Sequence, residues 1–359
     1  MLIRRLRWVF FLGSMLFVLG ASASPFRDPL VTPATMSARP EASRLTAVAA
    51  ANDRAIAVGP DGHILVSGDS GKTWQQAAVP VSSDLVAVRF LTKDKAWAVG
   101  HDGMVLHSGD GGRTWTKQLD GIQAAELMRD YYASRKTEGS PDAVKLNADV
   151  ERFVQEGADK PFFDVLFLNE NEGFVVGAFN ISFRTRDGGK TWEPLFDRTE
   201  NPGGFHLYGV VTVSDTVYLV GEQGLIRRWD PEGERFVVVD SPYVGSFFGA
   251  IGNDSLLVLF GMRGNAFASR NGGATWTTLK TDTTAGITSG AVLPDGRIVM
   301  TTYAGALLVS DDAMKEFTRV QTADPMAYAG VATTGEGGIV LAGKSGIRTE
   351  SIERTKNRE

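Results

Sequence analysis

The side chains with the clearest potential for chemistry in this sequence are carboxylates that recur in the same surroundings. The stretch SGDSGKTW (Ser67 to Trp74) returns as SGDGGRTW (Ser108 to Trp115), so one Asp stands twice among the same small and hydroxyl-bearing neighbours. Two carboxylates that face one another across a glycosidic bond are what a glycoside hydrolase needs. The first question is therefore whether the repeated Asp is a catalytic group or a structural one.

The repeated Asp is predicted to be structural, because it recurs more often than catalysis requires. In this pattern, the Asp box S/T-x-D-x-G-x-T-W, the carboxylate can accept backbone N–H groups across a tight turn. The Gly supplies a positive φ, and the Trp ring is expected to be buried against a neighbouring unit. Asn replaces Asp in one copy, and a later copy decays to DDAMKEF. The residues assigned to this scaffold are Asp69, Trp74, Asp110, Trp115, Asp187, Trp192, Asn271 and Trp276.

The Asp box belongs to a longer unit that recurs along the chain: an apolar strand, a short turn, a second strand and the box. A period near 40 residues built from four short strands is typical of a β-propeller blade. Seven such units occur, although the last lacks a convincing fourth strand, and they predict an all-β, seven-bladed propeller over residues 45–359. The anchor residues of the units are Gly59, Gly100, Gly177, Gly221, Gly261, Thr302 and Gly343.

Two segments lie outside this repeat. An insertion at about residues 121–158 separates the second unit from the third, and its apolar residues recur at helical spacing on both sides of a helix start at Ser140. We expect a helical hairpin that covers part of the channel mouth. The stretch from Leu30 to Ser37, within residues 24–44, precedes the first blade, and we expect it to supply a strand that closes the ring.

The first 23 residues have the pattern of a secretory signal peptide, with three Arg residues, an apolar run and an A-x-A site. The apolar run is shorter than the roughly 20 residues that span a membrane. Loss of those Arg residues lowers the formal charge from −5 to −8, which disfavours nucleic-acid binding. Since the chain has no Cys, packing alone must hold an exported fold. We expect a periplasmic protein without a membrane span after cleavage, and we favour a monomer.

The strand order predicts which loops share a face of the ring. If strands A to D run outward from the channel, the Asp boxes lie at one end, and the B–C and D–A loops lie at the other. The B–C loops differ in chemistry, as expected of a binding face on a repeated frame, although functionless variation of polar turns is the alternative. Aromatic and Arg side chains in two D–A loops suit peptide recognition. The candidate binding residues are His101, Asp102, Phe179, Asn180, Arg198, His206, Tyr208, Glu222, Tyr243, Phe247, Arg263, Tyr303 and Lys344.

The sequence offers little for catalysis, and we predict no catalytic residue, no metal and no cofactor. Asp61 and Asp102 are also the ordinary acids of D-G turns, and Glu222 has no obvious carboxylate partner. The four His residues lack metal-ligand spacing, and the Arg-Ile-Pro sequence of sialidases is absent. A glycan-binding protein or glycoside hydrolase that uses Glu222, Asp102 and the aromatic rim stays open as the alternative, and a structural envelope component as a third reading.

Tandem AVGxxGxxLxSxDGGxTW units, together with the run from GADKPFFDVLF (Gly157 to Phe167) to FRTRDGGKTW, resemble the BNR/Asp-box propellers of the photosystem II stability and assembly factor family. The resemblance covers nearly the whole mature chain. It implies a non-catalytic protein that binds a protein or peptide and assists a membrane complex. In photosynthetic members an Arg-rich face is thought to contact a membrane-protein precursor, and the matching candidates here are Arg44, Arg198 and Arg263. The helical insertion departs from the family pattern.

Overall fold

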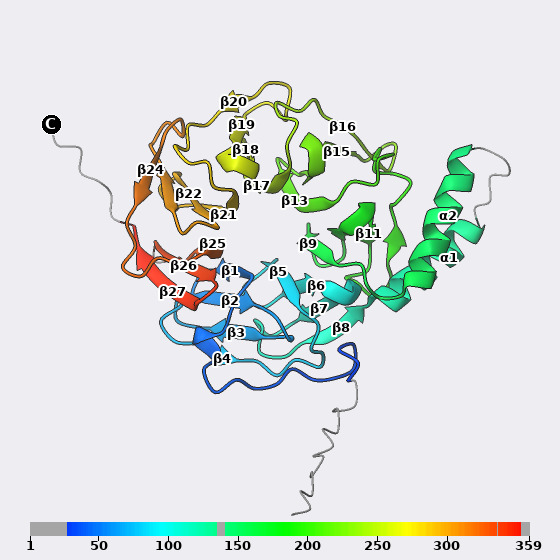
Figure 1. Ribbon diagram of the computed structural model, residues 1–359, viewed down its shortest axis with the longest axis horizontal. Helices are drawn as coiled ribbons and strands as arrows, with labels where there is room; N and C mark the ends of the chain where they lie inside the picture. The colour runs from blue at the N-terminus through cyan, green and yellow to red at the C-terminus, as the bar shows by residue number, and fades with distance from the viewer. Residues whose placement is uncertain (1–26, 135–140, 336, 353–359) are drawn as a thin grey trace, which may run out of the picture.

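Seven antiparallel sheets form a ring around a central channel in the computed structural model, which describes residues 27–134, 141–335 and 337–352 (Figure 1). Each sheet is one blade, and its strands follow one another outward in chain order. The fold class predicted from the repeat is confirmed. The first three blades comprise β1 (Ala47–Ala51), β2 (Arg54–Val58), β3 (Ile64–Ser67) and β4 (Gln75–Gln76); β5 (Leu85–Phe90), β6 (Ala96–Gly100), β7 (Val105–Ser108) and β8 (Thr116–Leu119); and β9 (Phe162–Phe167), β10 (Gly173–Gly177), β11 (Ser182–Thr185) and β12 (Glu193–Pro194).

The remaining blades repeat the pattern, except that the seventh has three strands among the described residues. They comprise β13 (Leu207–Val213), β14 (Thr216–Gly221), β15 (Ile226–Asp230) and β16 (Arg235–Val238); β17 (Phe247–Gly252), β18 (Leu257–Gly261), β19 (Ala266–Ser269) and β20 (Thr277–Thr278); β21 (Ile287–Val292), β22 (Ile298–Thr302), β23 (Leu307–Ser310) and β24 (Phe317–Val320); and β25 (Tyr328–Thr333), β26 (Gly338–Gly343) and β27 (Gly346–Ser351).

The core lies between neighbouring blades rather than at one centre. The second strand of each blade is apolar and buried on both faces, because another blade packs on either side of it. One cluster, for example, joins Tyr218 and Val220 of β14 to Phe247 of β17 and Leu257 of β18. Each blade therefore buries its apolar faces only when its neighbours are present.

A bulge near the start of the innermost strand shapes the mouth of the channel. In blades two to seven the second residue of this strand has no partner in the ladder, because the register shifts around it. The first residue then packs into the blade, and the second lines the channel. These unpaired residues are Val86, Phe163, Tyr208, Phe248, Thr288 and Ala329.

The two ends of the ring carry different loops, as the strand order predicts. On one end the amide of Ser70, in the first Asp box, donates to the carbonyl of Asp53 in the neighbouring A–B turn at 2.7 Å. On the other end the amide of Gly62, in a B–C loop, donates to the carbonyl of Ser83 in the following D–A loop at 3.0 Å. We refer to the second end, which carries the B–C and D–A loops, as the loop face.

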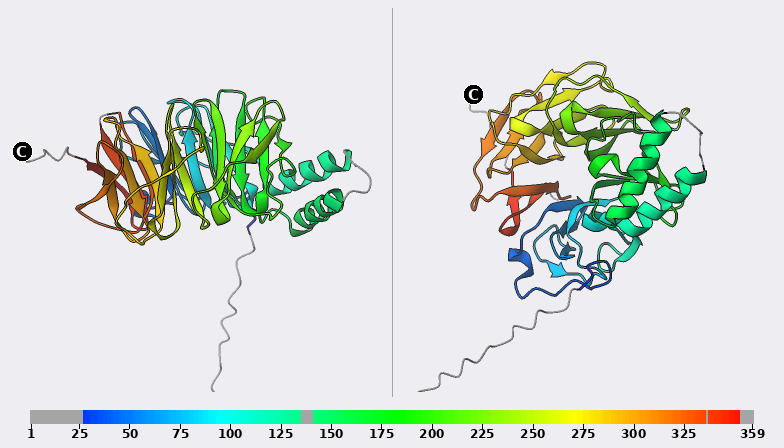
Figure 2. Two further views of the ribbon diagram at one scale, coloured as in Figure 1. Left: turned by 90° about the horizontal axis from the view of Figure 1, so that it is seen from above. Right: turned by 45° about the vertical axis from the view of Figure 1, so that its right-hand side comes forward.

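The insertion forms the expected helical hairpin, α1 (Gly121–Ser134) and α2 (Pro141–Glu156), but not over the channel. Both helices lie outside the ring, beside the third blade (Figures 1 and 2). Asp120 and Gln123 each accept the other's backbone N–H and fix the start of α1. The expected helix start at Ser140 lies outside the described residues. The predicted cover over the mouth was wrong, because the apolar side of the hairpin packs into the cluster that holds Trp192 of the third blade.

Residues 27–44 contain one short 3-10 helix, η1 (Pro40–Ala42), and no strand. The stretch from Leu30 to Ser37 therefore does not supply the ring-closing strand that we expected. It follows the outer edge of the first blade, where the amide of Ala34 donates to the carbonyl of Val79 at 3.0 Å. The ring is closed instead by packing of the first blade on the seventh, including a bond from the amide of Leu45 to the carbonyl of Gly343.

Candidate binding face

The Asp boxes use their polar atoms within their own turns. Asp69 accepts the amide of Thr73 at 2.9 Å, the hydroxyl of Thr73 at 2.6 Å and the hydroxyl of Ser67 at 2.7 Å. These three bonds lower the pKa of Asp69 to about 2, the Thr73 hydroxyl contributing most. A carboxylate that is occupied and strongly acidic in this way serves to hold the hairpin, and it is poorly suited to proton transfer.

The Trp of each Asp box packs towards the preceding blade. Trp115 lies in one buried cluster with Ile56 and Val58 of the first blade, and its indole N–H donates to the carbonyl of Gly112 at 2.8 Å. Trp74 does the same across the ring closure, in a cluster with Val340 of the seventh blade. The Asp-box end of the molecule is therefore a set of repeated joints between blades.

The loop face carries a chain of aromatic rings that crosses three blades. The ring of Phe179 lies 4.6 Å from that of His206, and His206 lies 5.9 Å from Phe163. Phe163 lies 5.3 Å from Tyr208, and Tyr208 lies 6.1 Å from Phe248, all measured between ring centroids. Edge-on and tilted pairs at such separations are favourable, so the rings hold one another in place.

Tyr303 of the sixth blade extends this row. Gly286 lies between the rings of Phe248 and Tyr303, where an added Cβ would stand 3.1 Å from one ring and 3.2 Å from the other. We refer to these rings together as the aromatic arc; its members are Phe163, Phe179, His206, Tyr208, Phe248 and Tyr303.

The arc presents apolar surface to solvent. Phe179 is 46 % exposed, Phe248 is 36 % exposed and Tyr303 is 58 % exposed, and Met262 and Val244 add exposed aliphatic surface in loops of the same face. Large apolar side chains scattered singly need no explanation, but a contiguous row on one face of a ring is typical of an interaction site.

The B–C loops share a backbone turn, and in the third blade this turn presents Phe179 of the arc. The loops include the 3-10 turns η2 (His101–Gly103), η3 (Ala178–Asn180), η4 (Glu222–Gly224) and η5 (Met262–Gly264), and their central residues have left-handed φ values. Phe179 has a φ of 50°. This region is costly for a bulky side chain, so the surrounding structure must hold it there.

Hydrogen bonds beneath the arc fix its polar members. The amide of Phe179 donates to Nδ1 of His206 at 2.8 Å, which places the remaining ring proton of a neutral imidazole on Nε2. Glu222 accepts the amide of His206 at 2.9 Å and the hydroxyl of Tyr208 at 3.4 Å. Burial, and then the neighbouring Glu222 carboxylate, raise the pKa of Tyr208 to about 12. Glu222 thus holds two members of the aromatic arc, His206 and Tyr208, in place.

The structure brings together five of the predicted residues, Phe179, His206, Tyr208, Glu222 and Tyr303, at the arc. Asp102 is half-buried in its turn, Tyr243 is half-buried against Phe247 and Phe267, and the exposed members of the remaining B–C loops are His101, Arg263 and Lys344.

Three predicted residues do not reach the loop surface. Phe247 is fully buried, because the bulge turns it into the blade and sends Phe248 outward. Asn180 is buried and donates to the carbonyl of Phe196 at 2.8 Å. It takes the left-handed turn position that Gly holds in other blades, with a φ of 70°, and its amide ties the loop to the next one.

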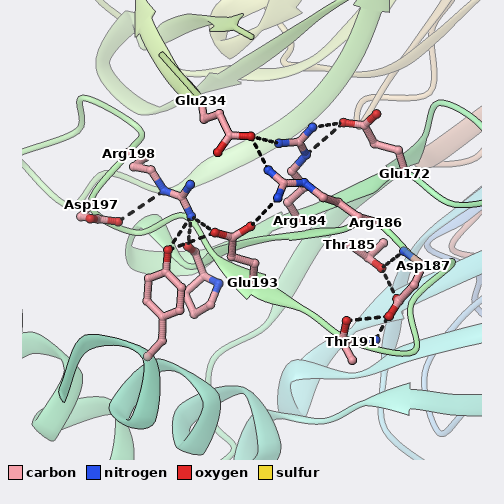
Figure 3. A network of polar contacts seen from close by, with 12 residues as sticks. Glu172, Arg184, Thr185, Arg186, Asp187, Thr191, Glu193, Asp197, Arg198 and Glu234 are labelled. Carbon is pink, nitrogen blue, oxygen red and sulfur yellow. Dashed lines mark hydrogen bonds and ion pairs between the residues drawn. The ribbon is translucent and has the colours of Figure 1, made fainter. Parts of the chain in front are cut away.

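Arg198 points to the outer rim instead of the mouth. Its guanidinium lies 2.9 Å from Glu193 and 3.8 Å from Asp197, and it also donates to the hydroxyl of Tyr131 in α1 at 3.0 Å. Figure 3 shows it at one end of a network that continues through Arg186 and Glu234 to Arg184 and Glu172. Arg198 therefore ties the helical hairpin to the third blade.

The predicted binding residues include neither Phe163 nor Phe248, although the sequence holds a signal for both arc members. Each stands second in an apolar pair that opens an inner strand, Phe162-Phe163 and Phe247-Phe248, where the bulge buries the first residue and exposes the second. Tyr208 obeys the same rule after Leu207. The second position of such a pair is thus the one that lines the mouth.

Below the arc, the inner strands line a channel of about 490 Å³ whose charged lining residues are Arg89 and Asp164. Two nitrogens of Arg89 donate to Asp164, at 2.9 Å and 3.1 Å. The negative charge of Asp164 raises the pKa of Arg89. The Arg89 side chain is 46 % exposed, because it faces the channel. Asp164 also accepts the amide of Val210 at 3.1 Å, so this pair joins the inner strands of three blades.

Within the described residues, no group of three or more His, Cys, Asp and Glu side chains is arranged to hold a metal ion. In the same part of the chain, no helix combines the length and apolar character needed to cross a membrane.

The sequence matches a known protein family over most of its length. Residues 21–109 and 146–310 match the sequence model described as "Photosynthesis system II assembly factor YCF48". No curated protein matches the chain. The unmatched interval contains α1 and the start of α2.

Solved structures share the fold at low sequence identity. One titled "YCF48 bound to D1 peptide" has a TM-score of 0.62 and 17 % identity, covering 90 % of this chain and 100 % of that one. YCF48 from Cyanidioschyzon merolae has a TM-score of 0.62 and 17 % identity, covering 87 % and 97 %. The WD40 propeller domain of Doa1 has a TM-score of 0.61 and 12 % identity, covering 90 % and 97 %.

Proposed function

This chain belongs to the family of the photosynthesis system II assembly factor YCF48, and on that premise we propose that it is a non-enzymatic protein that binds an extended polypeptide segment across its aromatic arc. The observation that carries the proposal is the row of partly exposed rings on the loop face, in mutual contact from Phe179 to Phe248 and continued past Gly286 by Tyr303. Its partner is a segment of a membrane-protein complex, as the assembly role of the family suggests.

The arc is suited to a peptide because its surface is apolar and fixed before binding. Aromatic rings contribute large contact area with few rotatable bonds, so little conformational entropy is lost when a ligand covers them. Glu222 is already bonded to the His206 amide and the Tyr208 hydroxyl, and Nδ1 of His206 accepts the amide of Phe179. Burial of the ring surfaces therefore favours binding, and the backbone of the peptide can stay hydrogen-bonded to water at the rim.

The channel-mouth carboxylate does not favour a glycoside hydrolase. Such an enzyme needs one carboxyl group as acid and a second as base or nucleophile. Glu222 is instead bonded to the His206 amide and the Tyr208 hydroxyl, which gives it a supporting role. We therefore place recognition, and not hydrolysis, at this face.

We also propose that the protein acts in the periplasm, which is where the signal-peptide pattern of residues 1–23 would send it; these residues lie outside the described part of the chain. YCF48, whose solved structure shares the fold of this chain, binds a D1 peptide in that structure. The proposal extends the binding of a peptide, by shared family membership, to this chain.

The test is photocrosslinking in living cells with a benzophenone amino acid in place of Tyr303. The control carries the same amino acid at Arg113, an exposed residue of the Asp-box face. We expect adducts with a membrane-complex polypeptide from position 303 and none of the same adducts from position 113. Absence of any polypeptide adduct at position 303 would contradict the proposal. Fluorescence anisotropy with a labelled D1 peptide then shows whether the partner is of the photosystem kind.

A further inference from the structure

A groove of about 670 Å³ lies beside the aromatic arc, between α2 and the loops of the third blade. Lys145, Leu146 and Arg152 of α2 form one wall, and the segment around Gly203 in the D–A loop forms the other. The apolar part of its lining comes from Leu146, Phe179 and Phe196. The groove therefore exists only because the helical hairpin stands next to the ring.

The polar groups that line this groove already have partners within the protein. Lys145 donates to the carbonyl of Pro202 at 2.6 Å, and Arg152 pairs with Asp149 at 3.3 Å. Glu200 accepts the amide of Val238 at 3.2 Å and lies 3.6 Å from Arg235. Because these groups are satisfied, the groove offers apolar surface to a ligand rather than an ion-binding site.

Phe179 belongs to both the groove and the arc. Its ring contacts His206 in the arc, lines the groove and lies 5.9 Å from the ammonium group of Lys160. Lys160 also lies 5.4 Å from the ring of Phe153 in α2, so one cation connects the hairpin to the arc. The apolar surface thus continues from the arc into the groove.

We propose that this groove receives an apolar side chain of the same polypeptide segment that crosses the arc. The inference rests on the proposed function and adds a second contact region to it, with selectivity for an aliphatic or aromatic residue at one end of the segment. The family model leaves residues 110–145 unmatched, which cover α1 and the start of α2, whereas Leu146 and Arg152 of the groove wall lie within the matched residues 146–310. The groove makes the ligand preference of this chain different from that of a propeller without the hairpin.

Photocrosslinking at Leu146, run beside the experiment at Tyr303, tests this extension in the full chain. We expect both positions to capture the same polypeptide, with the two crosslinked sites in one contiguous segment. Capture at position 303 but not at 146, or capture of unrelated proteins at the two positions, would overturn the groove and leave the proposed function intact. Absence of any polypeptide adduct at position 303 would contradict both the groove proposal and the proposed function.

Affinity measurements sharpen the test, with the captured segment synthesised as a fluorescent peptide. Leu146→Asp places a charge in the groove and should weaken binding about tenfold or more. Val144→Asp is the matched control, because Val144 is exposed on α2 and is not part of the groove lining. Its affinity should stay unchanged. Leu146→Ser covers the case in which the Asp variant unfolds the hairpin, which circular dichroism would detect. Unchanged affinity in both folded Leu146 variants would contradict the proposal.

Discussion

The two ends of the ring use the same frame in opposite ways. At the Asp-box end, Asp69 accepts its Thr amide at 2.9 Å, and Asn271 accepts the equivalent amide of Thr275 at the same distance. At the loop face, the equivalent turns present Asp102, Phe179 and Arg263 at one and the same left-handed backbone position. One end repeats its side chains and bonds them internally, while the other repeats only its backbone.

This difference separates scaffold from recognition without any knowledge of a ligand. A group that recurs in several blades and is satisfied in its own turn stabilises each blade. A side chain that occurs in one blade, is held in a costly conformation and remains exposed is free to meet a partner. The contrast predicts that changes at the Asp-box end lower stability, whereas changes at the arc lower affinity.

The largest effect is expected for Trp115→Ala. The ring is buried between the first and second blades, so its removal leaves a cavity in that joint. The free energy of unfolding should fall by about 3–5 kcal/mol, as for other large buried aromatic residues. Urea or thermal unfolding measures it.

Trp276→Ala is the matched control, since this ring is only partly buried. It should cost clearly less than Trp115→Ala. Equal losses for the two variants, or a loss below about 1 kcal/mol for Trp115→Ala, would break the link between burial at the joints and stability.

The next effect should appear mainly in affinity. Phe248→Ser removes a ring that is 36 % exposed between Tyr208 and Tyr303 in the arc and should weaken binding of the crosslinked peptide by about 1.5–3 kcal/mol. Stability should fall by only about 1 kcal/mol, since the substitution removes a partly exposed ring and its contact with Tyr208. Titration calorimetry and thermal unfolding of the same samples separate the two quantities.

Phe247→Ser provides the opposite pattern at the adjacent position. Because this ring is fully buried in the fifth blade, the substitution should lower stability strongly. If Phe248→Ser destabilised as much as Phe247→Ser, the bulge would not separate core from surface in the way that the register shows.

The fold could be predicted from the sequence, but only some of the residues exposed on the loop face could. The Asp boxes and anchor residues recur at a period near 40 residues that is interrupted once, so the ring and the presence of an insertion follow from them. The bulge that distinguishes Phe247 from Phe248 depends on a register shift against β18, which strand periodicity does not reveal. Aromatic residues in a D–A loop could therefore be assigned to the right region but not to the right side of the strand.

Tertiary contacts explain the other differences. The position of its D–A loop predicts that Arg198 lies at the channel mouth. In the structure, contacts with Glu193 and Tyr131 hold its side chain at the outer rim. The hairpin was expected above the channel because it leaves the ring at the loop face. Its apolar side instead packs in one buried cluster with Trp192 and Phe183 of the third blade. The place where the hairpin packs depends on which apolar surface the folded blade leaves exposed. That surface forms only when the blade folds, so sequence spacing does not reveal it.

A smaller effect on stability is expected for Asp110→Ala. The carboxylate accepts the amide and hydroxyl of Thr114 and the hydroxyl of Ser108. Loss of these bonds should cost about 1–2 kcal/mol in urea unfolding, since the turn is partly exposed and water can replace them. Asp110→Asn should cost only a few tenths, because Asn271 already makes the corresponding bonds in the fifth blade. A severe loss with Asn would indicate a role for the charge itself.

The smallest effect is the pH dependence that one Asp box contributes. In the folded state the hydrogen bonds from Thr73 and Ser67 hold the pKa of Asp69 at about 2, below its ordinary value. A depressed folded pKa means that the stabilisation is present above the unfolded pKa and is lost as the pH falls through about 2. Asp69→Asn keeps the acceptor but cannot titrate, so its unfolding free energy should depend less steeply on pH between about 4 and 2 than that of the wild type. Asn271→Asp should shift the slope in the opposite direction. Parallel pH profiles for all three proteins would show that the boxes act through geometry alone, and would leave the two ends of the ring distinguished only by what they expose.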